Sequence, residues 1–131
     1  MAEKMSAREQ AFIITFEKSF NDDMSVDEII SVANECENLS VSEKARLAAK
    51  GIDRNIEEID EIIEKHLRSW KKARLSKVAL AVLRLGVYEL TLSKTAPVGV
   101  IISEAVNICK TYGSDEDKSF VNGVLGAVAR G

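Results

Sequence analysis

The fifteen residues from Val78 to Leu92 read VALAVLRLGVYELTL and are apolar on nearly every side when placed on a helix. A run of this length exceeds the usual β-strand, and its alanines and leucines favour a helix. A helix that is apolar all round has no face suited to water, so other elements must surround it. The run therefore predicts a central helix that is covered by the rest of the chain.

The remaining sequence also reads as helix, so the expected fold class is all-α. Seven glycines and one proline in 131 residues leave few turns, while apolar residues recur at spacings of three and four almost throughout. Ser6, Ser25 and Ser40 are each followed three positions later by glutamate, which is the capping-box signature of a helix start. The first helix is expected to contain Ala11, Ile14 and Phe16, the second to point Ile29, Ile30 and Ala33 inward, and the third to carry Leu47, Ala48, Ile52 and Ile56.

The second half predicts four more helices, which gives about seven short helices in all. The first of them runs on from Ile59 through Ile62, Ile63 and Leu67 and ends before the polar stretch 70–74, and the central helix then begins near Ser76. Pro97 fits the first turn of the next helix, and Gly113 fits the position just beyond its end. The expected buried stripes of the last two helices are Ile101, Ala105, Ile108, Cys109 and Tyr112, then Val121, Val124, Leu125 and Val128.

Composition excludes several classes of protein. A chain of 131 residues with 46% hydrophobic content is sized for one compact domain with a real core. Charged residues make up 30% against a net charge of -3, which excludes a disordered polyelectrolyte and a strongly basic nucleic-acid coat protein. No apolar run reaches the roughly 18 residues of a membrane span, and no signal-peptide pattern opens the chain. A soluble, cytoplasmic protein without membrane contact is expected.

Residues of the kinds used in catalysis form no recognisable site. Cys36 and Cys109 stand far apart without a CxxC motif, so we interpret both as small buried hydrophobes. The single histidine, His66, has no nucleophile motif near it. An acidic cluster lies on a charged helical face without metal-ligand spacing, and it comprises Asp60, Glu61 and Glu64. No enzyme, metal or cofactor is therefore expected.

Charge is strongly segregated along the chain. Residues 21–64 carry four basic and thirteen acidic side chains, whereas residues 65–84 carry seven basic and no acidic ones. An acid-free stretch of this kind can follow a phosphate backbone or complement an acidic partner. It can equally be a solvated face that pairs with the acidic first half, so both interpretations stay open.

Segments of the second half form an ordered series that strongly resembles the NusB family. The chain reads VLRLGVYEL from Val82, PVGVIISEAVNICKTYG from Pro97 and FVNGVL from Phe120. These match the family's LR-x-x-x-YEL, P-x-x-V-x-I-x-EAV-x-x-x-K-x-Y-G and FVNGVL pattern with the same gaps, and the resemblance extends more loosely over the first half. It implies one all-helical domain made of two small helical subdomains, here about residues 1–57 and 58–131.

The resemblance also implies a function. Members of this family are transcription antitermination factors that bind the boxA RNA of ribosomal RNA leader transcripts. They bind it together with the small-subunit ribosomal protein NusE, within an elongation complex with RNA polymerase. No catalysis and no cofactor are implied.

Phe120 is the sharpest candidate for an RNA contact. On a helical wheel it lies roughly 90° from the centre of the buried face, so its ring either packs at the margin of the core or stacks on an unpaired base. Glu116 precedes it by one turn, and the family uses the matching aromatic and acidic positions at its RNA site. The candidate RNA-binding residues are Lys4, Arg8, Lys71, Lys72, Arg74, Glu116 and Phe120.

Two hypotheses for function follow. Many family members carry an arginine-rich N-terminal run, whereas the first seventeen residues here have only Lys4 and Arg8 as basic side chains. The first hypothesis is RNA-binding antitermination, and the alternative is a protein-interaction module of the same fold with little RNA affinity of its own. Three further residues are expected to serve the fold, with Arg84 and Glu89 inside the central helix and Gly123 where another helix approaches closely.

Overall fold

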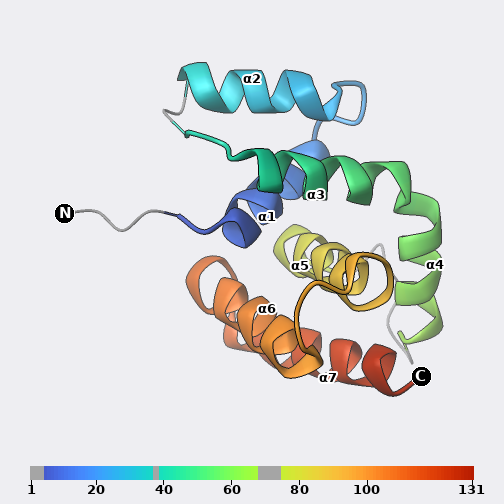
Figure 1. The fold of residues 1–131 in the computed structure, drawn as a ribbon. Helices are drawn as coiled ribbons and strands as arrows, with labels where there is room; N and C mark the ends of the chain where they lie inside the picture. The colour runs from blue at the N-terminus through green and yellow to red at the C-terminus, as the bar shows by residue number, and fades with distance from the viewer. Residues whose placement is uncertain (1–4, 37–38, 68–74) are drawn as a thin grey trace. The chain divides into compact units, whose positions relative to one another are not determined.

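The computed structural model describes residues 5–36, 39–67 and 75–131. Helices account for the regular structure of these residues, and no strand occurs among them, so the all-α prediction is confirmed. The chain divides into two compact units, Met1–Arg54 and Asn55–Gly131. The helices are α1 (Ala7–Lys18), α2 (Val26–Cys36), α3 (Glu43–Arg54), α4 (Ile56–Lys65), α5 (Lys77–Tyr88), α6 (Val98–Tyr112) and α7 (Asp115–Arg130), with a π-helical segment, η2 (Glu89–Ser93), after α5 (Figure 1).

The first unit packs α1, α2 and α3 around a small aliphatic core. Its buried cluster consists of Ile14, Val26, Ile29, Ile30, Ala33 and Ala49. The buried Gln10 side chain fixes the loop before α3, because its Nε2 donates to the Ser40 carbonyl and its Oε1 accepts from the Ser42 N–H, both at 3.0 Å. On the surface, Lys50 and Arg46 of α3 each lie 3.0 Å from the Asp27 carboxylate, and these hydrogen bonds lower the pKa of Asp27.

Two of the three predicted helix starts in this unit are confirmed. Glu9 donates its N–H to Ser6 Oγ, and Ser25 and Glu28 cap each other reciprocally at 2.8 and 3.1 Å. The prediction at Ser40 is wrong, since α3 begins two residues later with Ser42 Oγ accepting from the Ala45 N–H at 3.1 Å.

Two of the apolar side chains assigned to the third helix call for comment. Leu47 is 58% exposed, because the buried stripe of α3 runs through Ala45, Ala49 and Ile52 on another face. Ile56 belongs to α4, because α3 ends at Arg54. The exposed Cys36 also contradicts the expectation that both cysteines are buried, whereas Cys109 is buried and its burial raises the pKa of the thiol to about 11.

The second unit surrounds α5 with α4, α6 and α7, and α6 and α7 lie side by side (Figure 1). Eight of the twelve residues of α5 are buried and only Lys77 is exposed, in agreement with the prediction from the apolar run. The regular helix stops at Tyr88, and the remainder of the run forms η2, which ends at Lys94 in the left-handed conformation with φ of 48°. Pro97 precedes α6 as its N-cap rather than standing in its first turn, and Tyr112 at the other end is 38% exposed, not buried.

A buried ion pair joins α4 to α5. Arg84 Nε and Nη2 donate to the two carboxylate oxygens of Asp60, each at 2.9 Å, and these side chains are only 15% and 12% exposed. Asp60 therefore does not lie on a charged surface with Glu61 and Glu64, as the sequence led us to expect. Two parallel hydrogen bonds of this geometry fix the angle at which the guanidinium meets the carboxylate.

The glycine at a close helix–helix approach is Gly86, not Gly123. A Cβ atom at Gly86 would lie 2.7 Å from Cδ1 and 2.8 Å from Cδ2 of the fully buried Leu125 in α7. A Cβ atom at Gly123 would meet nothing within 4 Å, and this glycine is exposed. The expectation that Gly123 admits another helix is therefore wrong, because its side of α7 faces solvent. Within the described part of the chain, no helix is long and apolar enough to cross a membrane.

The two glycines form a matched pair for a stability test. Gly86→Ala and Gly123→Ala each gain helix propensity of about 1 kcal/mol, but only the first forces an atom against Leu125. Overpacking a core costs about 1–3 kcal/mol, so we expect Gly86→Ala to be less stable than Gly123→Ala by roughly that amount in urea unfolding. Equal free energies of unfolding for the two variants would contradict the close α5–α7 approach.

The ion pair predicts an asymmetric response to mutation. Asp60→Ala leaves the Arg84 guanidinium buried without its carboxylate, which should cost about 3–5 kcal/mol of stability. Replacing both partners together, by Asp60→Leu and Arg84→Met, should recover most of that loss because no buried charge remains. The exposed neighbour serves as control, since Glu61→Ala should change the free energy of unfolding by less than about 0.5 kcal/mol. A loss for Asp60→Ala no larger than that of the control would show that the pair does not stabilise the fold.

Candidate nucleic-acid interface

A groove opens in the second unit where the start of α5 meets the start of α7. It encloses about 590 Å³, and its lining residues are Leu75, Ser76, Ala79, Ser114, Glu116, Asp117, Ser119 and Phe120. Leu75, Ala79 and Phe120 make part of this lining apolar, whereas serine and carboxylate side chains make the rest polar. A concave surface that combines a few apolar walls with a few polar groups is the usual form of a ligand site.

Hydrogen bonds between the two helix starts hold the groove in shape. Ser76 Oγ caps α5 by accepting from the Ala79 N–H, and it donates to Asp117 Oδ1, both at 3.0 Å. Asp117 Oδ2 accepts from the Ser114 N–H while Ser114 Oγ accepts from the Asp117 N–H, both at 3.1 Å, which completes a capping box on α7. Both carboxylate oxygens of Asp117 are thus used in the fold. Asp117 is a structural residue, although it lines the groove.

Three neighbouring positions of α7 face the groove together. Glu116, Ser119 and Phe120 are spaced three and four residues apart, so they lie on one side of the helix. The Phe120 ring is half-buried, and Glu116 and Ser119 are exposed. This placement resolves the helical-wheel ambiguity in part, because Phe120 both packs against the protein and borders the groove.

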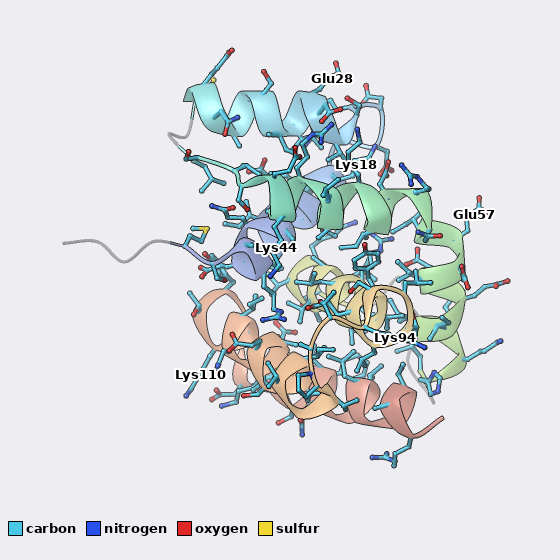
Figure 2. The ribbon with its side chains drawn as sticks, in the orientation of Figure 1. Lys18, Glu28, Lys44, Glu57, Lys94 and Lys110 are labelled. Atoms are coloured by element: carbon cyan, nitrogen blue, oxygen red, sulfur yellow. The ribbon has the colours of Figure 1, made fainter. Side chains whose placement is uncertain are left out.

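The groove is rich in hydrogen-bond acceptors. Glu116 and Asp117 contribute carboxylates, and no lysine or arginine is found among the described residues that line it. The nearest cation in sequence, Lys118, is 3.7 Å from the carboxylate of the fully exposed Asp115, an arrangement that water largely screens. Lys94, in the loop after η2, and Lys110, on α6, are exposed (Figure 2), and neither lines the groove.

The structure brings together two of the candidate RNA-binding residues, Glu116 and Phe120. Arg8 belongs to the first unit, where it stands partly buried in the first turn of α1 and takes part in an interaction. Four candidates lie outside the described residues, namely Lys4, Lys71, Lys72 and Arg74.

Sequence reasoning missed the serines that shape the groove and the structural role of Asp117. A local signal existed, because Ser114 and Asp117 have the spacing of a capping box. The bond from Ser76 to Asp117 had no such signal, since it joins residues 41 positions apart. Within the described residues, no group of three or more histidine, cysteine, aspartate or glutamate side chains is arranged to hold a metal ion.

Comparison with known proteins places this fold. Over 119 residues the chain is 40% identical to the transcription antitermination protein NusB of Lysinibacillus sphaericus, covering 91% of each protein. The solved structure of T. maritima NusB aligns with a TM-score of 0.80 at 34% identity, covering 98% of this chain and 93% of that one.

A second solved structure holds antitermination factors NusB and NusE in complex with double-stranded RNA. A chain of it aligns with a TM-score of 0.83 at 33% identity and covers 95% of this chain and 93% of its own length. The model of the NusB family matches residues 5–130, nearly the whole sequence. The sequence motifs, the helical fold and these matches agree, and the chain belongs to the NusB family, whose curated relatives are named transcription antitermination proteins.

Proposed function

We propose that this protein is an RNA-binding antitermination factor that recognises boxA RNA of ribosomal RNA leader transcripts together with the ribosomal protein NusE. The observation that carries the proposal is the half-buried Phe120 ring on the wall of the groove. An aromatic ring that borders an open groove offers a surface on which an unpaired base can stack. Such a site supports recognition of single-stranded RNA.

Family membership supports the choice of partners. The similar structure that contains NusB, NusE and double-stranded RNA shows a relative assembled with both kinds of partner. Antitermination acts on nascent RNA during elongation, so the proposed complex includes RNA polymerase and forms in the cytoplasm. Phosphate contacts are assigned in this proposal to Arg8 and to the basic residues Lys4, Lys71, Lys72 and Arg74.

The acidic lining of the groove favours a specific second candidate. Carboxylates repel RNA phosphates, and the described lining supplies no cation to offset them. A protein-interaction module that contacts NusE and has little RNA affinity of its own is consistent with that electrostatic character. Measuring RNA binding with and without NusE separates the two, since the module requires NusE for any RNA contact.

Phe120→Ala tests the proposed stacking contact. If one base stacks on the ring, its removal should cost about 1–3 kcal/mol of RNA affinity, which is roughly a 5- to 150-fold weakening. Titration of boxA RNA with the protein in the presence of NusE measures the change, and urea unfolding of the same variant reports the fold. Phe20→Ala serves as control, because Phe20 is an exposed phenylalanine of the first unit and should leave the affinity unchanged. A large fall in unfolding midpoint without loss of RNA affinity would assign Phe120 to the core instead.

Arg8→Ala tests the proposed phosphate contact. For single-stranded RNA, each lost phosphate contact reduces the slope of log affinity against log salt by about 0.7. We expect the variant to show that reduction, together with weaker binding at low salt. Lys44→Ala, at an exposed lysine of α3 (Figure 2), should leave the slope unchanged. An unaltered slope for Arg8→Ala would remove this residue from the site.

A further inference from the structure

We infer that an apolar surface at the start of α6 docks an acidic, aliphatic segment of a further protein partner. This surface, the Leu92–Val100 surface, consists of Leu92 in η2, Lys94 and Pro97 in the loop that follows, and Val98 and Val100 in the first turn of α6. All five residues are exposed. The inference goes beyond the proposed function, because it involves neither RNA nor the groove.

Exposed apolar side chains gather on this surface. Leu92 is 38% exposed, Val98 is 50% exposed and Val100 is 44% exposed, and the two elements that carry them, η2 and α6, are in contact. Among the described residues of the second unit, the other large apolar side chain of comparable exposure is Tyr112, at the far end of α6. Single exposed apolar residues are ordinary, but several in one place mark an interaction site.

The charge of the surface indicates the chemistry of its partner. Lys94 is the one charged residue in the sequence from Leu90 to Ser103, and the first turn of α6 carries no acidic side chain. Within the described part of the chain, the Lys94 ammonium forms no hydrogen bond or ion pair. Its backbone is fixed, since the Lys94 N–H donates to the Glu89 carbonyl at 2.9 Å. An aliphatic segment with a carboxylate complements an apolar surface with one such cation.

Two other occupants fit the surface less well. RNA binding relies on several cations and on aromatic rings for stacking, whereas this surface offers one lysine and aliphatic side chains. A second copy docked through the same surface would bring two Lys94 side chains together around a two-fold axis. No acidic side chain of the surface would offset that repulsion. The acidic segment of a different protein is therefore the occupant that the charges favour.

The Leu92–Val100 surface and the groove lie at opposite ends of the helices that connect them. The surface follows the end of α5, whereas the groove is at its start, and the twelve residues of α5 span about 18 Å. The fifteen residues of α6 likewise run from this surface toward the start of α7 (Figure 1). A segment docked here leaves the groove open, so both sites can be occupied at once.

A phage-displayed library of random peptides, selected on the full protein, is the probe. We expect enriched peptides to combine leucine, isoleucine or valine with aspartate or glutamate. A synthetic copy of the most enriched peptide is then titrated into the protein. Val98→Asp should weaken its binding about tenfold or more, because the new carboxylate interrupts the apolar area and repels the acidic peptide. Aspartate is favoured in the first turn of a helix, so urea unfolding should show that this variant stays folded.

A charge exchange identifies the acidic contact. Lys94→Glu should weaken binding of the peptide, and replacing the peptide's acidic residue by lysine should restore binding to this variant. Lys110→Glu, at an exposed lysine near the other end of α6 (Figure 2), is the charge control, and Leu47→Asp, at an exposed leucine of α3, is the apolar control. Both controls should bind the original peptide like the parent protein.

Several results would overturn the inference. They are the absence of enriched peptides, enrichment of basic peptides without acidic residues, and binding that Val98→Asp and Lys94→Glu leave unchanged. Competition between NusE and the peptide would assign the surface to NusE and overturn the further partner. Because peptide binding is measured without RNA, its failure leaves the proposed RNA binding standing. In turn, Val98→Asp should bind boxA RNA with NusE as the parent protein does, and a loss there would overturn the separation of this surface from the RNA site.

Discussion

The hydrogen bond from Ser76 to Asp117 is the contact on which the candidate site depends. It joins the N-cap residue of α5 to the first turn of α7, and the two residues are 41 positions apart in the chain. Each partner also caps its own helix, so one connected network satisfies the free N–H groups at two helix starts and fixes their separation. The groove is the space that this fixed separation leaves between Leu75, Ala79 and Phe120.

Deeper contacts of the second unit support that network. Gly86 lets Leu125 approach the backbone of α5 closely, and the Asp60–Arg84 pair ties the same helix to α4. Both contacts involve residues in the second half of α5. The helix is therefore fixed at its start by the Ser76 cap and further along by its packing against α7 and α4. A site built on rigid elements in this way keeps Glu116 and Phe120 in a constant relation, which base recognition requires.

The sequence predicted what local periodicity and capping chemistry determine. The buried run from Val78 specified the central helix, and the reciprocal cap at Ser25 and Glu28 formed as its spacing indicated. The Ser40 signature failed because Ser42 can cap the same helix two residues later, while Gln10 engages the Ser40 carbonyl from α1. Local spacing does not reveal such competition, since it depends on a side chain from another helix.

Long-range pairing explains the remaining differences. Gly86, and not Gly123, lies at the close helix–helix approach because of where α5 and α7 cross. The ion-pair partner of Arg84 is Asp60, which lies 24 positions away on α4. For the candidate site, the helical wheel placed Phe120 at the edge of the core, and the resemblance to the family drew attention to Glu116. The groove itself could not be predicted from the sequence, because its lining comes from two distant segments, the starts of α5 and α7.

The central claim is that RNA enters the groove at the starts of α5 and α7. Backbone amide chemical shifts, recorded while boxA RNA is titrated into the protein with NusE already bound, test it most directly. The account predicts that RNA addition shifts the amides of Ser76–Ala79 and Ser114–Phe120 more than those of the remainder of α5 and α7. Saturable RNA binding that leaves these amides unmoved and shifts residues elsewhere would contradict it.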